Sequence, residues 1–168
     1  MNNLAKYCPF VLLLICTACT QKTIAQNNSE AVNNTAIAEN NGLISVESSY
    51  DVATTSDRLA ETIEAKGLTL FTRIDHSANA QKAGLELNPT QLLIFGNPKA
   101  GTPLMNCSAT TAIDLPQKIL VVQNEDKQTQ VIYNDPQYLQ QRHNISGCDE
   151  VLTKVSDVLK GITEAATK

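Results

Sequence analysis

Hydrophobic and polar residues alternate in several short stretches of the chain, and this alternation predicts β-strands. Successive side chains of a strand point to opposite faces, so each alternating stretch predicts one buried and one exposed face. The stretch at 92–95 is apolar throughout, which is typical of a central strand. The predicted strands cover residues 43–50, 68–74, 92–95, 118–122 and 129–133.

Apolar residues with a helical period mark several of the stretches between and after these strands. The period is clearest near the C-terminus, where one face carries Val151, Leu152, Val155, Val158, Leu159 and Ile162. Each predicted helix follows a capping residue, namely Thr54 with Asp57, Ser77, Thr102 with Pro103, Asp135 with Pro136, and Ser146 with Asp149. The resulting order is roughly βαβαβαββαα. It predicts an α+β fold, a two-layer sandwich in which helices pack on a largely antiparallel sheet.

The N-terminus carries a different pattern, typical of a secretory signal peptide over residues 1–18. Lys6 supplies a positive charge before the apolar run 10–15, which is too short to span a bilayer permanently. Small residues directly before Cys19 resemble a bacterial lipobox, in which the cysteine is acylated and becomes the first mature residue. Cys16 departs from that motif, which usually has Leu at this position.

We therefore expect a protein that is lipid-anchored through Cys19 in a bacterial cell envelope. Thr20 stands where an Asp would resemble an inner-membrane retention signal, so the periplasmic face of the outer membrane is favoured. The alternative is a soluble periplasmic protein that is cleaved after Ala25. Polar residues without a period predict a flexible tether over 19–42, which leaves 43–168 as one globular domain.

Composition narrows the class of protein. The 168 residues include 13 Lys and Arg against 17 Asp and Glu, and the net charge of -4 argues against a nucleic-acid-binding surface. The aromatic content of 4%, without any Trp, is also low for stacking on bases. A hydrophobic fraction of 42% is enough for one packed core, and the length excludes a large multidomain enzyme.

Six short motifs occur in order through the predicted domain: Ile74-Asp75-His76, Phe95-Gly96-Asn97-Pro98, Gly101-Thr102-Pro103-Leu104-Met105, Ile113-Asp114-Leu115-Pro116, Tyr133-Asn134-Asp135-Pro136 and Arg142-His143. Together they resemble the domain-of-unknown-function family 302, small α+β proteins of bacteria and archaea, over roughly residues 43–165. The resemblance implies a compact fold and a homodimer, and it implies no particular reaction. The chain departs from the usual pattern at Cys107 and Cys148.

Two histidines and a carboxylate are the candidates for acid–base catalysis: His76, His143 and Asp75. A carboxylate beside an imidazole fixes the tautomer of the ring and raises its basicity. Asp75 and His76 are neighbours, however, and neighbouring residues of a strand point to opposite faces. We favour the structural alternative, in which Asp75 caps the following helix and His143, next to Arg142, binds carbonyl groups at a helix end.

The segment 96–102 is a second candidate site. Its glycines predict a loop that leads into a helix, and the free N–H groups there, with Lys99 nearby, suit a small carboxylate or phosphate. The segment lacks the Gly-Lys-Ser/Thr sequence of a P-loop. In the alternative interpretation the glycines only serve the turn. Met105, which follows this segment, is favoured as a core residue over a metal ligand. The candidate ligand-binding residues are Asn97, Lys99, Gly101, Thr102 and Met105.

Cys107 and Cys148 are the two cysteines outside the signal peptide and the lipobox. In an oxidising periplasm such a pair favours one disulfide. The alternative is a reactive thiolate at Cys148, where the first turn of a helix would lower the pKa of the thiol. Metal binding by His76, His143, Met105 and these cysteines is not supported by their spacing, so no metal or other cofactor is expected.

These features favour a periplasm-facing lipoprotein that works as a non-catalytic, dimeric binding or interaction module. The alternative is a small cofactor-free hydrolase or isomerase that uses His76 and His143, and metal handling is a third hypothesis. The enzyme alternative requires both histidines to line one cleft. Nucleic acid is not expected as a partner, and the small-molecule ligand is left open.

Overall fold

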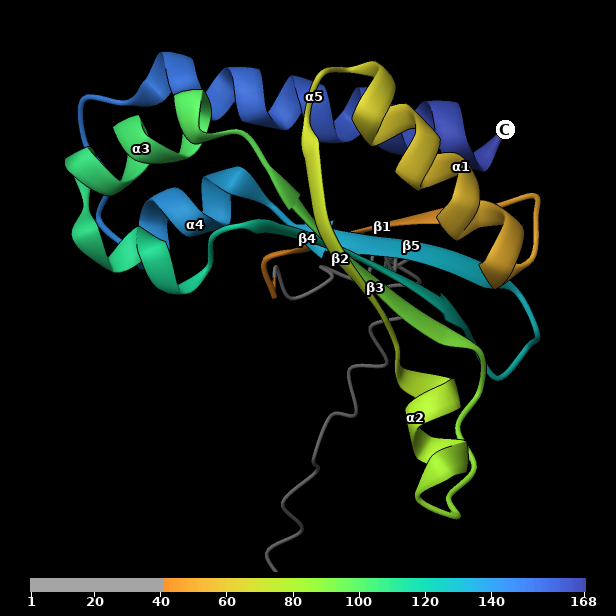
Figure 1. Ribbon diagram of the computed structural model, residues 1–168. Coiled ribbons are helices and arrows are strands. Elements are labelled where there is room, and N and C mark those ends of the chain that lie inside the picture. The colour runs from red at the N-terminus through yellow and green to blue at the C-terminus, as the bar shows by residue number, and fades with distance from the viewer. Residues whose placement is uncertain (1–40) are drawn as a thin grey trace, which may run out of the picture. The chain divides into compact units, whose positions relative to one another are not determined.

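The computed structural model describes residues 41–168, in which five strands form one antiparallel sheet (Figure 1). The strands are β1 (Leu43–Ser48), β2 (Thr69–Asp75), β3 (Thr90–Gly96), β4 (Gln117–Gln123) and β5 (Thr129–Asn134). Their order across the sheet is β1-β5-β4-β3-β2, and every neighbouring pair is antiparallel. The predicted signal peptide, Cys19, Ala25 and the tether up to residue 40 lie outside the described residues.

Helices connect the strands and cover one face of the sheet. They are α1 (Val52–Ala65), α2 (His76–Lys82), α3 (Pro98–Cys107), the short 3₁₀ helix η1 (Ala109–Ile113), α4 (Pro136–Arg142) and α5 (Asp149–Thr167). α1 and α5 lie side by side over the sheet, α3 and α4 lie at one end of it, and α2 projects from the opposite end (Figure 1). The predicted α+β fold is confirmed, with η1 as an additional element. Among residues 41–168, no helix is long and apolar enough to cross a membrane.

The hydrophobic core lies between the sheet and the two long helices. Side chains alternate along β3, so Leu93 and Phe95 are buried in this core, whereas Leu92 and Ile94 are only partly buried. β3 lies between β4 and β2 and is therefore paired on both sides, as expected of a central strand. Helices cover the face that carries Leu93 and Phe95. The helices contribute Leu59 and Ile63 from α1 and Leu159 and Ile162 from α5.

Two helices are capped by an aspartate that lies upstream of the predicted capping residue. Asp51, and not Thr54, caps α1, because its carboxylate accepts the Thr54 N–H at 2.7 Å. Asp75, and not Ser77, caps α2, where its carboxylate accepts the Ala78 N–H at 2.7 Å. A carboxylate makes a charge-assisted hydrogen bond to the free N–H groups of a helix N-terminus, and the Ser77 hydroxyl itself donates to the Asp75 carboxylate at 2.7 Å. The alternative role predicted for Asp75, as a helix cap, is therefore the one that the structure has.

Helix α3 begins earlier than predicted. The Asn97 side chain accepts the N–H of Lys99 at 2.9 Å, and Pro98 occupies the first helical position, where no N–H is needed. Thr102 and Pro103, which the sequence pattern places at the helix start, therefore lie inside the helix. The predicted loop over 96–102 is correspondingly wrong, since the chain is helical from residue 98.

Gly42, at the predicted boundary of the domain, packs closely against α4. Gly42 has φ +76°, and a Cβ atom on it would lie 2.3 Å from the ring of Tyr138 in α4. Only glycine both adopts this conformation readily and passes so close to the ring. The Gly42 carbonyl also accepts the N–H of Asp135 at 2.9 Å. Gly42 is therefore held against α4 and the start of that helix at the boundary between the predicted tether and the predicted domain.

Candidate functional site

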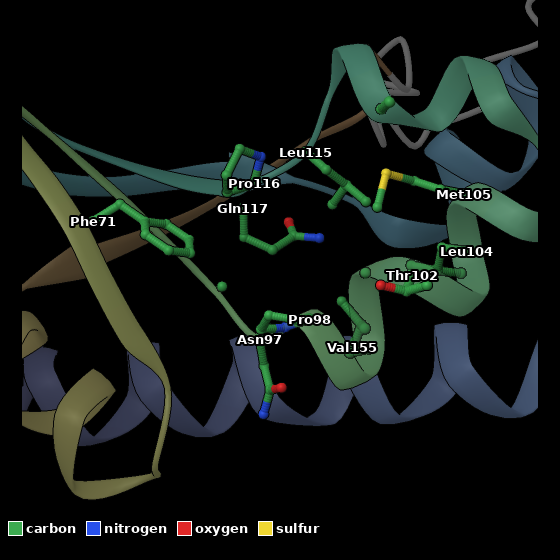
Figure 2. A pocket seen from close by; sticks show the side chains of 14 residues that line it. Phe71, Asn97, Pro98, Thr102, Leu104, Met105, Leu115, Pro116, Gln117 and Val155 are labelled. Carbon is green, nitrogen blue, oxygen red and sulfur yellow. The ribbon is translucent and has the colours of Figure 1, made fainter.

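A pocket of about 260 Å³ opens at the end of the sheet where β3 ends and β4 begins (Figure 2). Its walls are largely apolar and come from segments that are far apart in the sequence. They include Phe71 of β2, Leu104 and Met105 of α3, Leu115 and Pro116 before β4, and Val155 of α5. A concave apolar site with a few polar groups is the usual form of a small-molecule binding site.

A β-bulge in β2 places Phe71 at the edge of this pocket. β2 pairs regularly with β3 up to Leu70 and again from Thr72, so Phe71 is the extra residue. Its ring lies against Gly96, where a Cβ atom would come within 3.3 Å of the ring. The absence of a side chain at Gly96 therefore lets the half-exposed Phe71 close one side of the pocket.

Two polar side chains point into the pocket, the carboxamide of Gln117 and the hydroxyl of Thr102 (Figure 2). Gln117 is the first residue of β4 and shares its face with the buried Ile119 and Val121, so it is a polar residue at a core-facing position. Neither polar group has a hydrogen-bond partner within residues 41–168. None of the described residues that line the pocket carries a titratable side chain. From residues 41–168 the pocket can thus offer neutral hydrogen bonds, and none of these residues supplies it with a general acid or base.

A second polar cluster lies near the same end of the sheet and connects η1 with the end of α4. The buried His143 has its Nε2 2.6 Å from Oδ2 of Asp114 and its Nδ1 3.1 Å from Oγ1 of Thr110. Arg142 lies 3.5 Å from the same oxygen of Asp114. With the proton on Nε2, the ring donates to the carboxylate and accepts from the hydroxyl. This order of carboxylate, imidazole and hydroxyl can activate a hydroxyl nucleophile, but none of the three residues lines the pocket.

The other predicted catalytic residues lie elsewhere. The Ala78 N–H and then the Ser77 hydroxyl hold the pKa of Asp75 below its ordinary value, which makes this carboxylate a weaker base. His76 is exposed at the start of α2, at the opposite end of the sheet from His143 (Figure 1). The structure therefore does not bring the two histidines to one cleft, as the enzyme alternative requires.

Most of the candidate ligand-binding residues lie around the pocket. Asn97, Gly101, Thr102 and Met105 line it, whereas the exposed Lys99 does not. The Asn97 carboxamide caps α3 and points away from the cavity (Figure 2). The pocket consequently lacks the cation that an anion site in this segment was expected to have. Thr102 is the one candidate that supplies a polar group directed into it.

The structure joins Cys107 and Cys148 in a disulfide. The bond links Cys107, the last residue of α3, to Cys148, the residue directly before α5. Cys148, and not the predicted Ser146, is the N-cap of α5. A reactive thiolate at Cys148 and metal binding by the two cysteines are both incompatible with this bond. Among residues 41–168, no group of three or more His, Cys, Asp or Glu side chains is placed to hold a metal ion.

Substitution Gly101→Ala is expected to raise the free energy of unfolding by about 0.5–1 kcal/mol, because glycine inside a helix loses more backbone entropy than alanine. The added Cβ would lie 3.7 Å from Cδ1 of Leu115, an ordinary van der Waals distance. Urea unfolding measures the change. Gly96→Ala is the matched control, and it should not stabilise, because its Cβ crowds Phe71. A loss of stability in Gly101→Ala would contradict the packing of α3 described above.

A family model described as Domain of unknown function DUF302 matches residues 44–162. The fold is also found in a crystal structure of an uncharacterized conserved DUF302 protein from Bacillus stearothermophilus. The two structures have a TM-score of 0.68 with 20% sequence identity, over 76% of this chain and 98% of that one. This likeness supports the fold described above.

Two curated proteins from Brucella are similar in sequence to about two thirds of the chain. Fluoride-specific ion channel FluC 1 from Brucella suis biovar 1 (strain 1330) and FluC 1 from Brucella abortus biovar 1 (strain 9-941) are each 42% identical to it over 113 residues. The match covers 67% of this chain but only 44% and 42% of those proteins, so the chain spans less than half their length. The family model, in contrast, covers nearly all of the described domain and all six sequence motifs. The chain therefore belongs to the DUF302 family.

Proposed function

We propose that the protein is a non-catalytic binding module that holds a small molecule in the pocket between α3 and the end of the sheet. The observation that carries this proposal is the composition of the pocket. Its walls are apolar, its two inward-pointing polar groups, on Gln117 and Thr102, are neutral and unpaired within the described residues, and it contains no acid or base. Such a site can hold and orient a ligand but lacks the groups that move protons.

A hydrolase is the second candidate function, and the cluster of Thr110, His143 and Asp114 favours it. The exposed Thr110 hydroxyl lies 3.1 Å from the nitrogen of His143 that would accept its proton. The cluster lies outside the pocket, however, and it joins η1 to α4, which gives it a structural role. We therefore rank the binding module first.

We further propose that the module is presented at a membrane, anchored through Cys19 at the periplasmic face of the outer membrane, and is a homodimer, as its resemblance to family 302 implies. The signal-peptide pattern and the lipobox-like residues before Cys19 support this location. The Brucella relatives add support, because in them a similar segment is part of a protein named as an ion channel. Both the N-terminal pattern and the channel-named relatives fit a small domain that functions at a membrane.

Small neutral aromatic molecules are expected to bind in the pocket and to shift the NMR signal of the Met105 methyl group. The chain has two methionines, Met1 and Met105, and Met105 lines the pocket. In the protein labelled with carbon-13 at the methionine methyl groups, benzamide should shift the Met105 signal in a saturable way. For a ligand of this size we expect a dissociation constant of about 1 mM or tighter.

Ala100→Phe tests the location of binding, because Ala100 lines the pocket and a phenyl ring there should fill it. This variant should lose the saturable shift. Ala65→Phe introduces the same ring at an exposed position of α1 and should retain it. A shift that survives in Ala100→Phe would place binding elsewhere, and the absence of any shift in the unchanged protein would overturn the proposed function.

A further inference from the structure

We infer that the pocket selects an uncharged ligand with a single aromatic ring and one group that both donates and accepts a hydrogen bond. This inference rests on the proposed function and adds the class of ligand to it. It follows from the volume of the pocket, from the two polar groups of Gln117 and Thr102, and from the chemistry of the walls.

The volume of the pocket limits the size of the ligand. A dry apolar cavity of roughly 150 Å³ holds a benzene molecule. The pocket of about 260 Å³ is larger, and by the same scale it holds a ligand of roughly ten non-hydrogen atoms. That is one ring with a short substituent, which excludes nucleotides, peptides and other large ligands from complete enclosure.

The polar groups require a partner within the ligand. The Gln117 carboxamide approaches from the sheet and the Thr102 hydroxyl from α3, so the two converge from different walls (Figure 2). Each group can both donate and accept a hydrogen bond. A ligand without polar atoms would remove water from these groups and leave them unpaired, which is unfavourable. A primary amide or a hydroxyl on the ring would pair with them instead.

The remaining walls exclude charge and favour an aromatic ring. An ionised carboxylate or ammonium would lose hydration in the pocket and find no opposite charge on its walls, because none of the lining side chains within residues 41–168 is charged. The Phe71 ring offers an aromatic surface at one side of the pocket, and the Met105 thioether lies on another wall (Figure 2). Aromatic rings pack favourably against both of these groups.

Three probes of similar size test this selectivity through the Met105 methyl signal: benzamide, benzoate and toluene. Benzamide should bind the unchanged protein about tenfold or more tightly than either of the others. Substitution Gln117→Leu should weaken benzamide binding about tenfold and leave toluene binding unchanged or tighter. Gln141→Leu, the same change at an exposed position of α4, should alter neither. Thr102→Val removes the hydroxyl, the second of the two polar groups, at an exposed helix position and should weaken benzamide binding in a protein that still folds.

The outcomes separate the inference from the proposed function. Benzoate binding as tight as benzamide would overturn the requirement for an uncharged ligand. Toluene binding as tight as benzamide, with benzamide binding unaffected by Gln117→Leu and Thr102→Val, would overturn the role of the polar groups but leave the binding module in place. No Met105 shift with any of the three probes would overturn the binding module itself.

Discussion

Removing the disulfide between Cys107 and Cys148 is expected to lower the free energy of unfolding by about 3–4 kcal/mol. The two cysteines are separated by 41 positions, so the bond closes a long loop and restricts the unfolded chain. It also holds the end of α3 beside the start of α5, where Leu104 and Leu152 form part of a second apolar cluster. The double variant Cys107→Ala with Cys148→Ala removes the bond without adding a polar group to this cluster.

Urea unfolding followed by far-ultraviolet circular dichroism measures this change, with the oxidised and the reduced wild-type protein as references. The double variant and the reduced protein should show the same lower midpoint, and their m-value should be equal or larger because the unfolded chain is more open. The Met105 signal should also broaden, since α3 loses its link to α5. A loss below about 1 kcal/mol would show that loop closure contributes little to the stability of this domain.

His143→Ala is expected to lower the free energy of unfolding by about 2–3 kcal/mol. Only 5% of the His143 side chain is exposed, so the variant leaves an empty space where the ring was. It also removes the 2.6 Å hydrogen bond to Asp114. Among the side chains of the described domain, the Asp114 carboxylate, 16% exposed, would keep only its longer contact with Arg142 at 3.5 Å. The connection between η1 and α4 is thereby weakened.

His76→Ala is the matched control, because His76 is exposed and its side chain has no partner among the described residues. Its effect should stay within about 0.5 kcal/mol. An equally small effect of His143→Ala would contradict the structural role given to the cluster. The same variants distinguish the two candidate functions. Hydrolysis of p-nitrophenyl acetate that is lost in His143→Ala and Thr110→Val, but kept in His76→Ala, would favour the hydrolase.

The order of strands and helices could be predicted because each element shows its own period of apolar residues, two in a strand and about 3.6 in a helix. One local signal, Asp135 before Pro136, also predicts the start of α4 correctly, and its carboxylate accepts the N–H of Gln137 at 2.9 Å. The start of α3 could not be predicted in this way. A capping residue precedes a proline at Asn97 and again at Thr102, and local chemistry does not choose between them.

The site was less accessible to prediction, because its walls are assembled from distant segments. Thr102 is predicted as part of an anion-binding loop and Met105 as a further ligand candidate or a core residue, and the structure places both in the walls of an apolar pocket. Gln117 carried a usable signal, a polar residue in register with Ile119 and Val121, but the predicted strand began one residue after it. The contact of Asp114 with His143 had no local signal, since tertiary packing brings together residues 29 positions apart.

The bulge at Phe71 makes the pocket depend on the length of the chain as well as on its residue types. Deleting this one residue would make Leu70 and Thr72 adjacent and restore regular pairing with β3, while both keep their faces of the sheet. β2 is an edge strand, so only one neighbour has to accommodate the change. In an evolving lineage, the gain or loss of a single codon would therefore add or remove one wall of the binding site.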